Sequence, residues 1–239
     1  MKISNEKLWH TPIKAYSDYL REVEVHGLEA VMKLGKFQKA RETRALAVLC
    51  FAMYKIMDTP WYLQLDQSEV TDGRIMRQSP GNPGDSEKGN VEITTCMRHG
   101  DGSLPAQSLL EQLKRKKTFE TFHKYGPHDL ILVDLGSNMI KEDGVDFDAL
   151  SAYLRSINAP YALWAIEQIE HDNEDTIVQI TVCMPEVQQY RMNVGEAWAE
   201  QMDKGVRGTL VSQRTSDSAK ADIKLGGEPI TRTVWDFED

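Results

Sequence analysis

The stretches PWYLQLDQSE (60–69), VTDGRIMRQS (70–79) and NVEITTCMR (90–98) follow one another along the chain and decide its fold. The residue pattern of each stretch predicts a strand. Asp72 lies near the start of the second strand, and Glu92 lies in the third. If the strands pair as neighbours, the two carboxylates can meet at one end of a small sheet, and converging carboxylates hold a hard divalent cation.

A basic helix is predicted directly after these strands, in PAQSLLEQLKRKKTFETFHK (105–124). Leucines and phenylalanines form its apolar face. Between Glu111 and Lys124, five basic residues oppose two acidic ones, a net charge of +3 on a chain whose overall charge is −9. The overall charge argues against a protein that coats nucleic acid with its whole surface. The local excess predicts a basic groove, with a solvated helix face as the alternative.

The remaining elements are predicted from periodicity and from turn residues. Helices are expected at 12–34, ended by Gly35, and at 37–57, ended by the Asp58-Thr59-Pro60 triplet. The segment SPGNPGDSEKGN (79–90) is dense in Gly, Pro and Asn, which predicts a loop. Further along, we expect a strand buried on both faces at 129–137, a helix at 145–157, a hairpin of strands 161–169 and 176–184, and a short helix at 186–204.

This order of elements predicts an α/β fold with a mixed central sheet flanked by helices. The chain of 239 residues is long enough for one large domain with an appendage. We expect a single domain over residues 1–204 with its core at about 37–137. Residues 205–239 are polar and turn-rich, which is typical of a partly ordered, mobile tail.

Composition indicates a globular protein of the cytoplasm. Apolar residues make up 41% of the chain and charged residues 27%, and no stretch is apolar enough to span a membrane. The N-terminal residues lack the apolar block of a signal peptide. The three cysteines Cys50, Cys96 and Cys183 are far apart and form no CxxC pair, so reduced thiols are expected and structural zinc is not.

The order of elements and the two acids resemble the restriction-endonuclease-like nucleases, the PD-(D/E)xK superfamily. The core of that family is a helix, three strands, a helix and a strand, with an acid on the second strand and an acid-x-lysine on the third. Asp72 matches the first acid and Glu92 the second, and the resemblance covers residues 37–137. The chain departs from the family at Thr94, which stands at the position of the family's lysine.

The resemblance implies a metal-dependent nuclease acting on DNA or RNA. Asp72, Glu92 and the carbonyl of Ile93 would hold Mg²⁺ or Mn²⁺, and Glu42 on the preceding helix would be an additional ligand. The ion would polarise a phosphate and lower the pKa of a bound water. A homodimer or another protein partner is compatible with this class.

Basic side chains on the helix after the strands complete the implied site. Some members of the superfamily carry the catalytic lysine on this helix, where Lys116 continues the spacing of Leu109 and Leu113, and Lys117 is the next candidate. This lysine would stabilise developing charge. The residues Lys114, Arg115 and Lys124 would contact phosphates without reading sequence.

Other interpretations remain open. Asp72 could be a plain turn residue of a Thr-Asp-Gly triplet, and Glu92 could point to solvent. Asp85, Glu87 and His99 are lesser ligand candidates, whereas Asp134 at a strand end is interpreted as structural.

Two other functions are also compatible with the sequence. The uncharged Thr94 and the acidic chain favour an inactive member of the fold that acts as an interaction or regulatory protein. A small-molecule-binding α/β domain would instead have a pocket at the end of DLILVDLGS (129–137).

Overall fold

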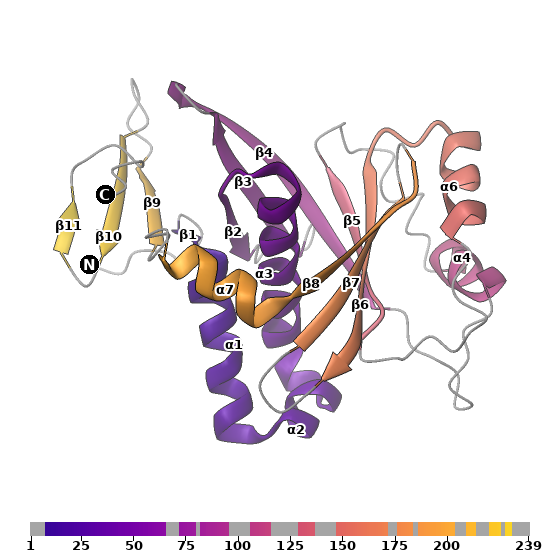
Figure 1. Ribbon diagram of the computed structural model, residues 1–239, viewed down its shortest axis with the longest axis horizontal. Coiled ribbons are helices and arrows are strands. Elements are labelled where there is room, and N and C mark those ends of the chain that lie inside the picture. Colours follow the sequence, from indigo (N-terminus) through magenta and orange to yellow (C-terminus); the bar gives the residue numbers. More distant parts are fainter. Residues whose placement is uncertain are drawn as a thin grey trace. The chain divides into compact units, whose positions relative to one another are not determined.

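The computed structural model describes residues 8–65, 72–79, 82–95, 106–115, 129–136, 147–171, 176–183, 186–203, 209–213, 220–225 and 228–230. The chain divides into two compact units, the first comprising residues 1–88 and 196–239 and the second residues 89–195. Each unit combines helices with strands, so the predicted α/β class is confirmed (Figure 1).

Helices α1 (Pro12–His26), α2 (Leu28–Lys33) and α3 (Gln38–Met57) belong to the first unit, where α1 packs against α3. The Thr11 side chain accepts a hydrogen bond from the Lys14 amide at 3.2 Å and caps α1. The helix predicted over 12–34 ends early, at Gly27 rather than at Gly35. The φ of +82° at Gly27 is one that glycine adopts without strain. The helix predicted at 37–57 is confirmed as α3.

The sheet of the first unit has the order β11-β10-β9-β1-β2-β3, followed by the beginning of β4 (Asn82–Thr95). Its strands are β1 (Leu8–His10), β2 (Trp61–Leu65), β3 (Gly73–Ser79), β9 (Thr209–Gln213), β10 (Lys220–Leu225) and β11 (Glu228–Ile230). Strand β9 pairs antiparallel with both β1 and β10. Of residues 205–239 the structure describes only β9, β10 and β11, so the partly ordered tail stays a prediction.

The loop predicted at 79–90 is wrong from Asn82 onward, because β4 begins there. Arg77 on β3 donates from Nε and Nη2 to the two carboxylate oxygens of Glu87 on β4, at 2.7 and 2.8 Å. The guanidinium of Arg77 also lies 5.6 Å from the centroid of the Trp61 ring on β2. Cross-strand contacts of this kind stabilise the strands despite the glycines and prolines that signal a turn.

The second unit contains the end of β4, then β5 (Leu130–Asp134), β6 (Ala162–His171), β7 (Thr176–Val182) and β8 (Gln188–Asn193), in that spatial order. Strands β4, β5 and β6 run parallel, whereas β6, β7 and β8 are antiparallel. The hairpin predicted from strands at 161–169 and 176–184 is confirmed. The helix predicted at 186–204 starts only at α7 (Val194–Asp203), because β8 occupies the preceding residues.

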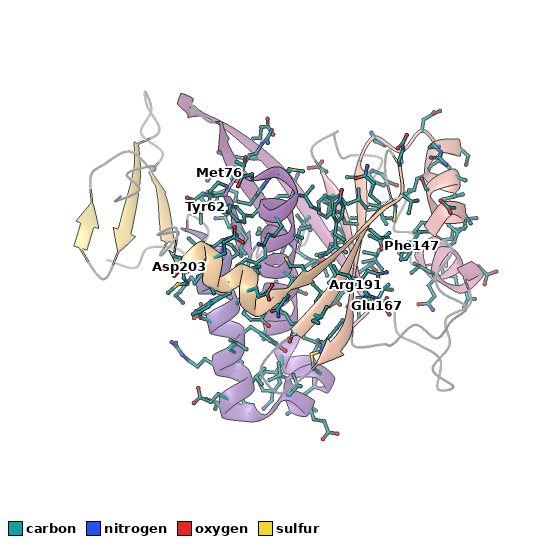
Figure 2. All side chains as sticks on the ribbon, in the orientation of Figure 1. Tyr62, Met76, Phe147, Glu167, Arg191 and Asp203 are labelled. Carbon is teal, nitrogen blue, oxygen red and sulfur yellow. The ribbon has the colours of Figure 1, made fainter. Side chains whose placement is uncertain are left out.

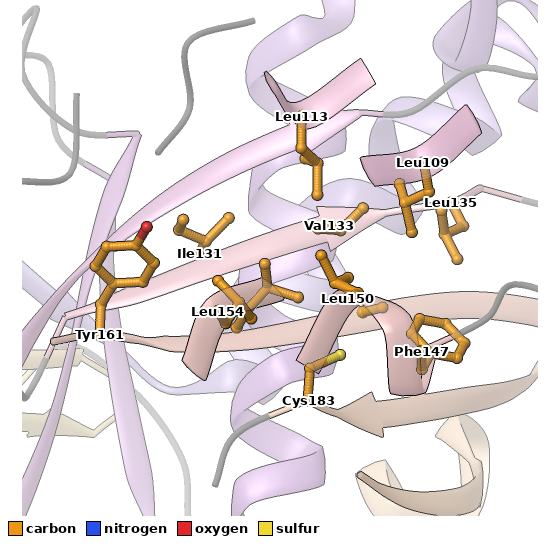
Figure 3. Packing of buried hydrophobic residues seen from close by; sticks show 12 residues of the cluster. Leu109, Leu113, Ile131, Val133, Leu135, Phe147, Leu150, Leu154, Tyr161 and Cys183 are labelled. Carbon is orange, nitrogen blue, oxygen red and sulfur yellow. The ribbon is translucent and has the colours of Figure 1, made fainter. Parts of the chain in front are cut away.

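Helices α4 (Ala106–Arg115) and α6 (Phe147–Ser156) pack on one face of this sheet (Figure 3). Leu109 and Leu113 from α4 and Leu150 and Leu154 from α6 meet alternate residues of β5 and β6 in a single apolar cluster. Every residue of β5 is buried, which confirms the strand predicted to be covered on both faces. This core fixes the position of α4 relative to the parallel strands.

The cysteines Cys50 and Cys183 are free and buried, as predicted, and Cys96 lies outside the described residues. Burial raises the pKa of the Cys183 thiol to about 12. Burial disfavours the thiolate, so both thiols are unreactive in the folded protein. None of the helices in the described ranges is long and apolar enough to cross a membrane.

Gly73 is the position where β3 comes closest to α3, and we expect Gly73→Ala to destabilise the first unit. A Cβ at this residue would overlap Leu46 Cδ1 and lie 3.1 Å from the carbonyl oxygen of Gln64. Overpacking of this kind costs about 1–3 kcal/mol. Urea unfolding should show this loss, whereas Gly35→Ala, whose added Cβ would meet nothing within 4 Å, should change stability by less than about 0.5 kcal/mol. Equal stability of the two variants would contradict the close packing at Gly73.

Candidate active site

The first acid of the predicted pair, Asp72, directly precedes β3 and is half-buried. Its neighbour Gly73 pairs with Leu65 at the end of β2, and the same register aligns Tyr62 with Met76 (Figure 2). The structure therefore places Asp72 at the start of the second strand of the run, as the sequence predicts.

Helix α3 brings Glu42 to the same end of the first unit as Asp72. The chain reverses at residues 58–60, so β2 runs back along α3, which packs against both β2 and β3. The contact of Gly73 with Leu46 fixes the start of β3 against this helix. Glu42 precedes Leu46 by about one helical turn, roughly 6 Å along the axis, on the same face. Glu42 and Asp72 therefore both lie towards the end of the first unit where Leu46 meets Gly73.

The carboxylate of Glu42 is buried and incompletely satisfied. Its side chain is only 8% exposed. Gln38 Nε2 donates to Glu42 Oε1 at 2.8 Å. Lys39 Nζ lies 3.2 Å from Oε2, but no donor in the described part of the chain meets hydrogen-bond geometry with that oxygen. A buried carboxylate oxygen without a hydrogen bond is costly, and such groups are concentrated at functional sites.

Glu92 belongs to the second unit, on the part of β4 that pairs with β5. The parallel register aligns Glu92 with Ile131 and Thr94 with Val133. Aligned residues of neighbouring strands point to the same face of a sheet. Glu92 and Thr94 therefore share the face that α4 covers, while Ile93 points to the opposite face. Glu92 is half-buried and Thr94 is 7% exposed, so the residue at the position of the family's lysine is an uncharged, buried one.

The apolar face predicted for the basic helix is confirmed, because Leu109 and Leu113 are fully buried. Lys114 Nζ lies 4.2 Å from the centroid of the Tyr153 ring on α6, and Arg115 is 3.5 Å from Glu111. Exposed contacts of these kinds are weak, so both side chains remain available to an anionic ligand. The other basic candidates, Lys116, Lys117 and Lys124, lie outside the described residues.

The lesser candidates are explained by local structure or lie outside the described side chains. Glu87 is held by Arg77 in the ion pair described above. Asp134 Oδ1 accepts a hydrogen bond from the Gly136 amide at 2.9 Å, in a turn where Gly136 has a φ of +66°. This contact supports the structural interpretation of Asp134. The Asp85 side chain and His99 are not among the described groups.

Sequence reasoning missed Lys39 and Glu167. Lys39 is separated from Glu42 by three residues on a predicted helix, a spacing that brings side chains together and could have drawn attention to the pair. Glu167 lies on β6 and is 3% exposed. The register of β6 with β7 and β8 aligns it with Gln179 and Arg191. The apolar residues around Glu167 predict a strand, but nothing in the sequence indicates that this acid is buried.

The described residues contain no group of three or more His, Cys, Asp and Glu side chains that could hold a metal ion. Mg²⁺ commonly uses one or two carboxylates, with waters and substrate phosphates as its other ligands. The residues of the first unit offer this smaller donor set, in Glu42 and Asp72.

No protein-family model matches the chain, and neither the curated proteins nor the solved structures include a significant match. Its function is therefore inferred from the chain's own residues.

Proposed function

We propose that this protein is a metal-dependent phosphodiesterase that cleaves DNA or RNA, with a core of the restriction-endonuclease-like kind. The observation that carries the proposal is the buried carboxylate of Glu42, whose Oε2 accepts no hydrogen bond from the described residues. Glu42 lies near the N-terminus of α3, the end towards which Asp72 also lies. The chain order of α3, then β2, β3 and β4, then α4 and β5, also supports it, as does the parallel pairing of β4 with β5.

In this proposal, the first unit supplies Glu42 and Asp72 as ligands of Mg²⁺ or Mn²⁺. The resemblance implies Glu92 and the backbone carbonyl of Ile93 as further ligands. All four donors are hard oxygen atoms, which these cations prefer. A cation bound there would polarise the phosphate and lower the pKa of a water.

The residues of α4 and those following it would hold the substrate. Lys114, Arg115 and Lys124 would bind backbone phosphates, whose contacts position a nucleic acid without reading its sequence. Lys116 or Lys117 would place positive charge near the phosphate. A local run of basic residues on a protein of net charge −9 favours local binding over coating of nucleic acid.

The test is cleavage of plasmid, single-stranded DNA and RNA with Mg²⁺ or Mn²⁺, combined with calorimetry of metal binding. We expect Asp72→Ala and Glu92→Ala to lower cleavage by about 100-fold or more, since each removes a metal ligand. Glu24→Ala is the matched control, because Glu24 is an exposed acid on α1. Cleavage that survives chelation of the metal, or wild-type protein that neither binds metal nor cleaves, would overturn the proposal.

A second candidate is an inactive nuclease-fold protein that acts through a partner. The buried, uncharged Thr94 favours it, since threonine cannot stabilise charge at the phosphate. This candidate predicts metal binding without cleavage by the wild-type protein. The small-molecule alternative is less favoured, because the Asp134 carboxylate at the end of β5 is already bonded within its own turn.

A further inference from the structure

Lys39 on α3 contacts the proposed metal ligand Glu42, but the proposed function gives this lysine no role. We propose that its ammonium contacts the scissile phosphate of the nucleic acid and supplies positive charge there. The inference rests on the proposed function and adds a catalytic residue to it. A cationic group fixed at the developing charge of a transition state is among the largest contributions that a side chain makes to catalysis.

The geometry of Lys39 suits this role. Its Nζ lies 3.2 Å from Glu42 Oε2, while its side chain is 60% exposed and that of Glu42 only 8%. The lysine therefore reaches from solvent to a buried carboxylate. Its ammonium is a point charge on a flexible stem. A metal ion at Glu42 Oε2 would displace the ammonium from that oxygen, and the lysine, three residues away on the same helix and 60% exposed, would stay close to the ion.

The surroundings of Lys39 carry a positive charge of their own. Residues 36–44 contain two lysines and two arginines against one glutamate, a net charge of +3 on an acidic chain. Two of these neighbours are engaged elsewhere. Arg41 Nη1 donates to the carbonyls of Val31 and Leu34 at 2.8 and 2.9 Å, and Lys36 Nζ lies 4.7 Å from the centroid of the Phe37 ring. Neither of them takes part in the proposed phosphate contact, which falls to Lys39.

An ordinary ion pair between neighbouring helix residues is the competing explanation, and such pairs contribute little. It makes a different prediction. A structural lysine would leave the rate of the chemical step unchanged when removed, whereas a lysine at the phosphate lowers kcat. Under both explanations, removing Lys39 frees Glu42 Oε2 from its competing cation. Metal affinity alone therefore does not distinguish a structural Lys39 from a catalytic one.

The experiment compares Lys39→Ala, Lys39→Arg and the control Lys36→Ala, each as the full chain, by kcat, KM and Mg²⁺ affinity from calorimetry. We expect kcat of Lys39→Ala to fall by about 100-fold, with partial recovery in Lys39→Arg and an Mg²⁺ affinity equal to or tighter than that of wild type. Lys36→Ala should stay within about threefold of wild type in kcat. Equal thermal midpoints would exclude misfolding as the cause.

Lys39→Ala with wild-type kcat overturns the inference and leaves the proposed function standing, provided that the wild-type protein binds Mg²⁺ and cleaves. A fall in kcat confined to Lys116→Ala or Lys117→Ala would likewise overturn it, by placing the charge after α4. A wild-type protein that neither binds Mg²⁺ nor cleaves is the separate outcome in which the proposed function itself fails and takes the role of Lys39 with it.

Discussion

Replacing Glu42 with glutamine is expected to lower metal-dependent cleavage by about 100-fold while leaving the protein at least as stable as the wild type. The amide keeps an oxygen that can accept from Gln38, as Glu42 Oε1 does at 2.8 Å. It removes a buried negative charge whose second oxygen accepts no hydrogen bond from the described residues. The loss of a metal ligand therefore lowers activity, whereas the removal of a buried charge maintains or raises stability.

Cleavage rates with Mg²⁺, together with urea unfolding in the absence of metal, measure both effects. Glu24→Gln on the exposed face of α1 is the matched control and should change neither quantity. Glu42→Gln that keeps wild-type cleavage would remove Glu42 from the metal ligands. A loss of several kcal/mol in stability would instead show that the carboxylate has a structural role, because breaking a buried ion pair typically costs about 3–5 kcal/mol.

The elements that could be predicted from the sequence are those whose pattern is local. The apolar run of α3 and the triplet at Asp58 define that helix, and the buried run at 129–137 defines β5. Leu109 and Leu113 face the core because their spacing of four residues places them on one side of α4. In each case, the signal lies within the element itself.

The errors arise where distant residues decide the structure. Strand β9 forms by pairing with β1, from which it is separated by most of the chain. The part of β4 that begins at Asn82 lies beside β3, where Arg77 forms an ion pair with Glu87, and turn propensity takes no account of such cross-strand contacts. The sequence predicts the end of the first helix at Gly35, whereas the helix ends at Gly27. Both glycines follow an amphipathic pattern, and only the positive φ of Gly27 distinguishes them. Strand propensity depends strongly on such context.

The residues of the candidate site also differ in whether the sequence could identify them. Asp72 and Glu42 could be named from residue type and element order, but their placement at one end of α3 depends on the contact between Gly73 and Leu46. Lys39 was missed because a lysine near a glutamate on a helix is common. Only the contrast in exposure between the two side chains, 60% against 8%, sets this pair apart from ordinary surface pairs.

The second large effect is expected in the core that positions α4. Leu154 on α6 is fully buried in the cluster with Leu109 and Leu113, so Leu154→Ala should destabilise the second unit by about 2–5 kcal/mol. The range is wide because the cost depends on how far the neighbouring side chains can collapse into the cavity. Chemical denaturation followed by circular dichroism measures the loss.

Arg155→Ala is the matched control, because Arg155 is the next residue on α6 and is exposed. It should shift the unfolding free energy by less than about 0.5 kcal/mol. A loss below about 1 kcal/mol in Leu154→Ala would mean that α6 packs loosely on the sheet. In that case, the position of Lys114 would also be in doubt, because its contact with Tyr153 depends on the same helix. The core variant therefore tests the scaffold of the basic surface without touching any proposed ligand.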